Sequence, residues 1–208
     1  KASPDDGLER RTHAERGRKE EALRCFGEAV SREPRYFNAW NSLGSTLREM
    51  GRIEESLAAC RESLRKNPRH WLAALNLAAG LVESGRLREA LETVRKVPTD
   101  THGWPQVAGK VAWALATDAQ DVLRDGISAE ALAREACAAS GSRDANVLDA
   151  LAAALAENGK YAEAVEAVQH ALRRALAARD GELAQRLRAR MIRYEQSLPF
   201  RGGAGEAR

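Results

Sequence analysis

The chain has 208 residues, of which 44% are hydrophobic, 30% are charged and only 5% are aromatic. This is the composition of a foldable chain of closely packed helices, and it excludes an intrinsically disordered protein. The net charge of +3 comes from 33 basic and 30 acidic residues mixed along the chain, so no basic stripe predicts nucleic-acid binding. No apolar run reaches about 18 residues, so we expect no direct insertion into a membrane.

The N-terminal region predicts a complete helix preceded by a weak one. Residues 7–16 are mostly charged, with Leu8 and Ala14 as their only apolar side chains. A helix there would be weak or partial because it has little surface to bury. After Gly17, residues 19–32 carry apolar side chains at helical spacing, and we expect them to form a full helix.

Residues 37–68 predict a pair of packed helices. Trp40 begins the apolar face of a first helix, and a second apolar stripe follows after Gly51. Gly51 suits a helix end with positive φ. Gly44 and Ser56 are small residues on the facing sides, and we expect them to let the two helices approach closely.

The same pattern recurs at a constant interval. Gly17, Gly51 and Gly85 stand 34 residues apart, and the segment that begins at Trp71 repeats the apolar positions of residues 37–68. Because chance rarely produces such a spacing, we interpret the chain as a series of equivalent helix pairs.

The copy that begins at Trp71 ends early, since Pro98 arrives four residues before its expected place. Residues 98–105 therefore predict a true loop. Trp104 lies in this loop between a glycine and a proline. We expect its side chain to fold back against neighbouring helices, and an exposed anchor for a partner is the alternative.

A looser copy follows the loop. Residues 107–117 and 128–140 predict its two helices, the second with a serine cap. Residues 118–126 are longer than a repeat turn. The glycine spacing agrees, because Gly85 and Gly159 are 74 residues apart, six more than two periods.

The C-terminal part predicts one more helix pair and a final helix. Residues 145–178 carry the repeat pattern again, and residues 181–196 form an amphipathic stretch. Such a final helix would cover the apolar end of the stack. The residues from Pro199 onward predict a disordered tail.

These features resemble the tetratricopeptide repeat (TPR), whose period is about 34 residues. In the best copy the motif positions are held by Trp40, Leu43, Gly44, Leu47, Gly51, Ser56 and Pro68. The resemblance implies an all-α fold, a right-handed superhelical solenoid of antiparallel helix pairs with a C-terminal capping helix. It also implies a scaffold that binds other proteins.

On this interpretation the chain divides into six ordered parts and a tail. They are a degraded or partial first TPR unit at 1–36, TPR units at 37–70 and 71–104, a divergent TPR-like unit at 105–144 with a loop insertion at 118–126, a TPR unit at 145–178, a capping helix at 179–198 and a disordered tail at 199–208.

A second resemblance concerns the last hundred residues. The segments 113–117 (WALAT), 123–126 (LRDG) and 199–201 (PFR) are similar to segments in a group of bacterial TPR proteins. In that group the repeats often end larger chains that contain membrane-spanning or glycosyltransferase parts. The resemblance therefore leaves open an accessory role in a larger enzyme or membrane protein, with the catalytic part outside this chain.

The resemblance also implies a binding groove, because the first helices of stacked pairs line the concave side of the solenoid. Asparagine amides there could hydrogen-bond a peptide backbone, and leucines could form an apolar floor. The alternative is that these are ordinary surface residues. The predicted contacts are Asn38, Asn41, Ser45, Arg48, Leu72, Leu75, Asn76 and Ala79, and the same offsets in residues 145–178 give Asn146, Asp149, Ala153 and Ala156.

One specific form of peptide binding is not predicted. Some relatives hold a C-terminal carboxylate with a clamp of lysine, asparagine and arginine. Here Gly7, Arg11, Leu72 and Leu75 stand at the clamp positions. An extended segment or a helix of a partner is therefore the expected ligand.

No pattern of catalytic or metal-binding residues stands out. The histidines are scattered, without an HExxH, GxSxG or P-loop motif. Cys25, Cys60 and Cys137 lack metal-ligand spacing, and we expect them to be small buried hydrophobic residues. Asp149 and Glu157 are expected to be solvated. We therefore predict no enzymatic activity, cofactor or metal.

The predicted function is a protein–protein interaction scaffold that binds a partner peptide or helix, as a monomer or a weak homo-oligomer. The compartment is not fixed by the sequence. A cytoplasmic location is preferred, and an upstream signal or membrane anchor stays open because the chain begins at Lys1 without methionine.

Overall fold

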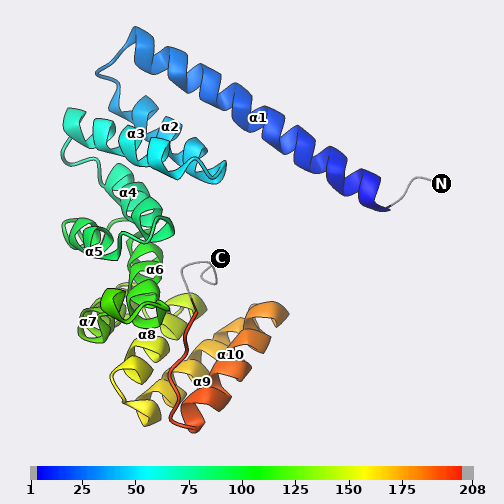
Figure 1. The fold of residues 1–208 in the computed structure, drawn as a ribbon, viewed down its shortest axis with the longest axis vertical. Helices are drawn as coiled ribbons and strands as arrows, with labels where there is room; N and C mark the ends of the chain where they lie inside the picture. Colours follow the sequence, from blue (N-terminus) through cyan, green and yellow to red (C-terminus); the bar gives the residue numbers. More distant parts are fainter. Residues whose placement is uncertain (1–3, 203–208) are drawn as a thin grey trace. The chain divides into compact units, whose positions relative to one another are not determined.

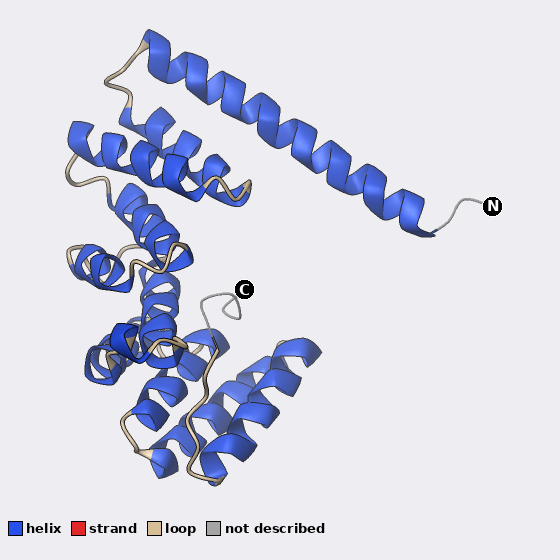
Figure 2. Cartoon of the chain, viewed as in Figure 1, coloured by secondary structure: helices blue, strands red, loops and turns tan. Residues whose placement is uncertain are grey.

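The computed structural model describes the backbone of residues 4–202 and the side chains of residues 16–202. Every regular element in this range is a helix (Figures 1 and 2). The chain forms two compact units, Lys1–Gly80 and Leu81–Arg208, whose boundary falls inside helix α4 (Trp71–Glu83). They are called the N-terminal unit and the C-terminal unit below.

The N-terminal unit contains α1 (Pro4–Arg32), α2 (Phe37–Glu49), α3 (Ile53–Lys66) and most of α4. Helices α2 and α3 pack against each other at Gly44. A Cβ atom on Gly44 would lie 2.7 Å from the Sγ of Cys60 and 3.2 Å from the carbonyl oxygen of Ser56. Because Ser56 and Cys60 are fully buried, the close-packing role predicted for Gly44 and Ser56 is confirmed.

A pair of alanine substitutions tests this close approach. We expect Gly44→Ala to lower the free energy of unfolding by about 1–3 kcal/mol, because the new methyl group has no room. Gly27 in α1 is the matched control, since a Cβ there meets nothing within 4 Å. Gly27→Ala should raise stability by up to about 1 kcal/mol through helix propensity. Urea denaturation of both variants checks this, and equal effects would contradict the packing.

Three of the repeat glycines end helices, as predicted, whereas Gly17 does not. Gly51, Gly85 and Gly159 have φ values of 76°, 73° and 74°, in the left-handed region that glycine enters without a steric penalty. The amide after each glycine donates to a leucine carbonyl five residues earlier, at 2.8–2.9 Å, in the pairs Arg52–Leu47, Arg86–Leu81 and Lys160–Leu155. This is the hydrogen bond of a Schellman cap.

The first predicted helix pair differs from this pattern. Helix α1 runs without a break from Pro4 to Arg32, through Gly17. A reversal at Gly17 would have to be stabilised by packing of residues 7–16 against residues 19–32. The former have only two apolar side chains, so little is gained by folding back, and helix-favouring Glu, Arg and Ala residues continue the helix instead.

The C-terminal unit continues with further helices connected by turns and two longer loops (Figure 1). Helix α6 packs against both α7 and α8, α8 packs against α9, and α9 packs against α10. The bounds are α5 (Leu87–Arg95), α6 (Trp104–Thr117), the 3-10 turn η1 (Asp121–Leu123), α7 (Gly126–Ala139), α8 (Ala145–Glu157), α9 (Tyr161–Ala177) and α10 (Gly181–Glu195).

Helix α6 begins three residues before its predicted start. Trp104 is 1% exposed, and its Nε1 donates to the carbonyl oxygen of Val94 at 3.1 Å. Pro105 falls in the first turn, where a missing amide hydrogen costs nothing. The tryptophan therefore folds back, as expected, and the loop before it spans residues 96–103 instead of the predicted 98–105.

Helix α7 also begins earlier than the serine cap suggested. Its cap is Asp125, whose carboxylate accepts a hydrogen bond from the amide of Ser128 at 3.0 Å. Residues 118–125 form the longer connection, predicted at 118–126, and contain η1.

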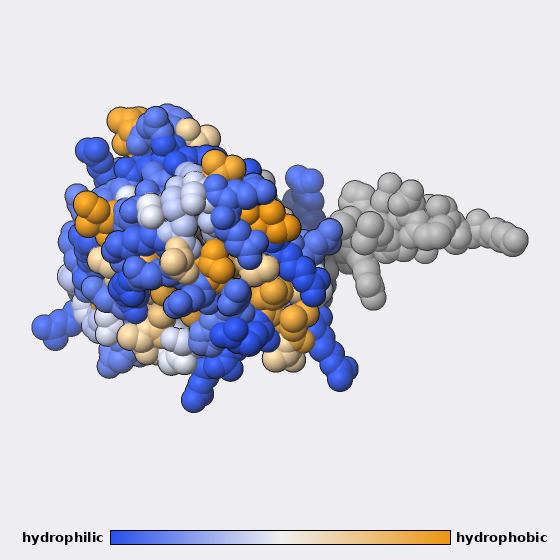
Figure 3. Space-filling view, turned by 90° about the horizontal axis from the view of Figure 1, so that it is seen from below, coloured by the Kyte–Doolittle hydropathy of each residue, from blue (hydrophilic) through white to orange (hydrophobic). Residues whose placement is uncertain are grey.

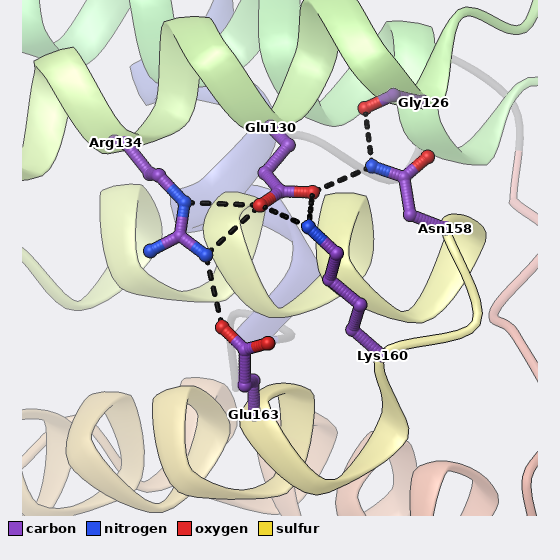
Figure 4. Close-up of polar contacts among 6 residues, drawn as sticks. All are labelled: Gly126, Glu130, Arg134, Asn158, Lys160 and Glu163. Carbon is purple, nitrogen blue, oxygen red and sulfur yellow. Dashed lines mark hydrogen bonds and ion pairs between the residues drawn. The ribbon is translucent and has the colours of Figure 1, made fainter.

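A buried carboxylate joins α7 to the turn between α8 and α9 (Figure 4). Glu130 accepts hydrogen bonds from Lys160 at 2.9 and 3.0 Å, from Asn158 at 2.7 Å and from Arg134 at 2.9 and 3.0 Å. Arg134 also bonds Glu163 of α9 at 2.9 Å. Burial disfavours the charge, but these donors outweigh it and lower the pKa of Glu130 to about 2.

This contact predicts a specific loss of stability in acid. The ordinary pKa of glutamate is 4.5 and that of Glu130 in the fold is about 2. Its stabilisation is thus complete above pH 4.5 and is lost as the pH falls towards 2. Glu130→Gln should cost roughly 1–3 kcal/mol at pH 7 and progressively less at lower pH.

Urea denaturation of the two proteins between pH 7 and pH 2.5 measures this difference. Glu163→Gln is the control, because the side chain of Glu163 is 53% exposed and its ion pair is expected to contribute little. A difference between Glu130→Gln and the parent that stays constant across this range would contradict the assignment.

The face of the molecule in Figure 3 is of mixed character. In the view of Figure 3, hydrophobic residues are interspersed among hydrophilic ones. In the described part of the chain, no helix has the length and apolar character needed to cross a membrane. Cys60 and Cys137 are buried as expected, and burial raises the pKa of each thiol to about 11, whereas Cys25 is exposed.

Candidate functional site

The residues predicted to line a groove in the N-terminal unit come from α2 and α4. Asn38 is exposed and Leu72 is 52% exposed, while Ser45, Arg48 and Asn76 are half-buried. Three others are buried, with exposed fractions of 7%, 3% and 6% for Asn41, Leu75 and Ala79.

The two inner asparagines bond each other. The Nδ2 of Asn76 donates to the Oδ1 of Asn41 at 2.9 Å, which connects α4 to α2. Replacing both by alanine would therefore disturb internal packing as well as any binding. Asn38 and Leu72 are cleaner probes of partner contact on this face because their side chains reach solvent.

A pocket of about 330 Å³ lies in the C-terminal unit between α6, α8 and α10. This volume is at the lower end of the range of small ligand sites. The helices around it are the predicted first helices of two successive pairs and the capping helix. Its polar lining includes Lys110, Trp113, Asn146, Asp149, Arg186 and Arg190, and two of these, Asn146 and Asp149, hold predicted groove positions.

A buried ion pair forms one wall of the pocket. Arg190 of α10 bonds Asp149 of α8, and both side chains are 6% exposed. The guanidinium carbon of Arg190 lies 4.2 Å from the ring centre of Trp113 in α6. Burial raises the pKa of Asp149 to about 6, against the attraction of Arg190 and Arg186.

The expectation that Asp149 is solvated was therefore wrong. Its partner lies 41 residues away in the sequence, and only the packing of α10 against the preceding helices brings the two charges together. Glu157, also expected to be solvated, is half-buried and pairs with Arg124 at 3.0 Å and with Arg201 at 2.6 Å.

Several polar atoms beside this pair are not satisfied. Among the described residues, no hydrogen-bond partner exists for the buried Oδ1 of Asp149, Nε1 of Trp113 or hydroxyl of Tyr194. Burial also raises the pKa of Tyr194. An unsatisfied buried polar group costs about 1–3 kcal/mol. Such costs concentrate at functional sites, where a ligand can supply the missing partner.

The segment 198–202 crosses the same face beyond α10. The ring of Phe200 lies 5.6 Å from that of Trp113 and 4.9 Å from the guanidinium carbon of Arg190, measured to ring centres. The amide of Gly202 donates to the carbonyl oxygen of Thr117 at 3.0 Å. Thus residues 199–202, the first four of the predicted disordered tail, make defined contacts. The main one is the packing of Phe200 against Trp113 and the buried Arg190. Residues 203–208 lie outside the described part.

These contacts unite the three segments of the second resemblance. Phe200 and Gly202 touch residues 113–117, and Arg201 shares the carboxylate of Glu157 with Arg124 from segment 123–126. The last segment is far from the other two in the sequence but meets them in the fold.

The fold and the pocket define a helical-repeat protein, a class that uses the exposed faces of stacked helix pairs for recognition. Two sequence models of the tetratricopeptide repeat match the chain, over residues 11–68 and 47–114. The chain belongs to the tetratricopeptide repeat family.

Solved structures agree with this fold. MamA is 12% identical to this chain, with a TM-score of 0.65. The alignment covers 81% of this chain and 95% of MamA. TTC0263, a TPR protein of Thermus thermophilus, is 22% identical, with a TM-score of 0.58. The alignment covers 89% of this chain and 93% of TTC0263. YrrB, described as a TPR protein with an unusual peptide-binding site, is 14% identical, with a TM-score of 0.56. The alignment covers 82% of this chain and 92% of YrrB.

The predicted all-α helical-repeat fold is confirmed by these similarities. Among curated proteins, no significant sequence match is found.

Proposed function

We propose that the chain is a protein–protein interaction scaffold that holds an extended segment of a partner on the face formed by α6, α8 and α10. TPR proteins generally mediate protein–protein interactions, and YrrB is described as having a peptide-binding site. The pocket of about 330 Å³ has room for one or two side chains of such a segment.

The observation that carries this proposal is the chemistry of the unsatisfied atoms. The Oδ1 of Asp149 can accept a hydrogen bond, and the Nε1 of Trp113 can donate one. Both atoms are buried in this structure, so a peptide unit, which offers the complementary amide hydrogen and carbonyl oxygen, reaches them only when the side chains around them move. Lys110 and Asp144 add charges of both signs to the rim, which suits a segment of mixed polarity.

A second candidate is the face of the N-terminal unit predicted from the repeat register. There Leu72 is 52% exposed and Asn38 is exposed, so an apolar and an amide side chain are available to a partner. Ser45, Arg48 and Asn76 would contribute at its edge, with Asn41, Leu75 and Ala79 supporting them from beneath.

Peptides selected from a random displayed library against the whole chain test both faces. Their affinities are measured by calorimetry for the parent and for Lys110→Glu and Asn146→Trp, which change the charge and the space of the pocket. We expect these variants to weaken binding by about tenfold or more. Lys96→Glu, an exposed change outside the pocket lining, is the matched control.

Binding that is lost instead in Asn38→Ala and Leu72→Ser would assign the ligand to the N-terminal unit. Affinities that none of these variants changes would refute both faces.

A further inference from the structure

The segment 198–202, called the strap below, occupies part of the face assigned to the partner. Its Phe200 covers Trp113 and Arg190, both of which also line the pocket. The strap thus shows what this surface accepts, namely an extended chain with an aromatic side chain over the indole and the guanidinium group.

The residue after the aromatic ring has its own contact. The guanidinium of Arg201 lies 2.6 Å from the Oε2 of Glu157 at the end of α8. The backbone is held at the two sides, since Arg193 donates to the carbonyl oxygen of Pro199 at 3.1 Å and Gly202 donates to Thr117 at 3.0 Å. An aromatic residue followed by an arginine is therefore the pattern that fits.

The strap is nevertheless an incomplete ligand. It supplies no hydrogen bond to the Nε1 of Trp113 or to the Oδ1 of Asp149, which stay without partners among the described residues. Its Leu198 is 47% exposed and gains little from burial. A segment that kept the aromatic and arginine contacts and also satisfied these two atoms would bind better than the strap does.

We propose that the strap is a displaceable internal ligand, and that partners of this protein carry an extended segment in which an aromatic residue precedes an arginine. The partner's aromatic ring takes the place of Phe200, and its arginine takes the place of Arg201 on Glu157. The inference rests on the proposed function, because it names the partner's chemistry and adds a competitor within the chain.

The closing experiment separates the strap from its site. A chain ending at Ser197 is titrated with a blocked peptide of residues 197–202, Ser-Leu-Pro-Phe-Arg-Gly, and binding is followed by calorimetry. We expect the peptide to bind this shortened chain and to bind the whole chain at least about tenfold more weakly, because the strap competes there. A peptide carrying Phe200→Ala should bind the shortened chain at least about tenfold more weakly than the parent peptide.

Two results would overturn the proposal. One is a folded shortened chain that does not bind the peptide, and the other is equal binding by the shortened and whole chains. If the shortened chain does not fold, the whole chain with Phe200→Ala and Arg201→Ala replaces it, under the same expectations.

Hydrogen exchange of the whole chain provides an independent readout. In a displaceable strap the amide of Gly202 exchanges much faster than the amides in the middle of α6. If the amide of Gly202 exchanged at the same rate as those amides, the strap would be a permanent part of the fold, and the proposal would be overturned.

The two hypotheses fail separately. If library-selected peptides do not bind while the strap peptide binds the shortened chain, the strap is supported as an internal ligand and the proposed binding of a partner is refuted. If selected peptides bind the pocket but the strap peptide does not, the proposed function stands and the strap inference fails.

Discussion

Asp149→Ala is expected to lower the free energy of unfolding of the C-terminal unit by about 3–5 kcal/mol. The substitution leaves the guanidinium of Arg190, whose side chain is 6% exposed, without its counter-charge. Part of the energy is recovered if Arg190 turns towards solvent, but Trp113 and Phe200 hold it on one side. Urea denaturation monitored by circular dichroism measures the effect.

The matched control removes both charges together. In Asp149→Leu with Arg190→Met, an apolar pair of similar size replaces the ion pair, and most of the lost stability should return. A cost below about 1 kcal/mol for Asp149→Ala would show that the pair is accessible to water and would contradict its burial.

Trp104→Ala should have a comparable effect, about 3–5 kcal/mol, because it empties the space of a large side chain that is 1% exposed. Trp104→Phe keeps most of the apolar volume but loses the hydrogen bond to the carbonyl oxygen of Val94, and it should cost clearly less. The same denaturation assay applies. Equal costs for the two variants would mean that the hydrogen bond, and not the packing, dominates at this position.

The repeat turns could be predicted because their cause is local. A glycine at the end of an apolar helix face readily adopts a positive φ, as Gly51, Gly85 and Gly159 do. Gly17 shows the limit of this reasoning. Its neighbours have the spacing of a repeat, but the residues before it lack the apolar surface that would make a reversal favourable, and the helix continues.

The site could be predicted only in part. The repeat register places Asn146 and Asp149 towards the pocket, since that follows from the position of each residue within its helix pair. The register contains no signal for the pairing of Asp149 with Arg190 or the contact of Phe200 with Trp113. Both depend on how α10 and the segment after it return over earlier helices, which is a property of tertiary packing.

One available signal pointed to the strap. The segments 113–117, 123–126 and 199–201 were grouped by resemblance alone, and they lie together in the fold through Trp113, Arg124 and Arg201. Segments that share a family pattern and meet in space are candidates for a common role, here the attachment of residues 199–201 to α6 and α8.

A nuclear magnetic resonance titration of the whole chain with a library-selected peptide tests the central claim most directly. We predict that the indole N–H signal of Trp113 shifts, together with the backbone amides around Lys110, Asn146 and Gly202. Shifts confined to α7 and α9, with the Trp113 indole signal unchanged at saturation, would contradict the proposed binding face.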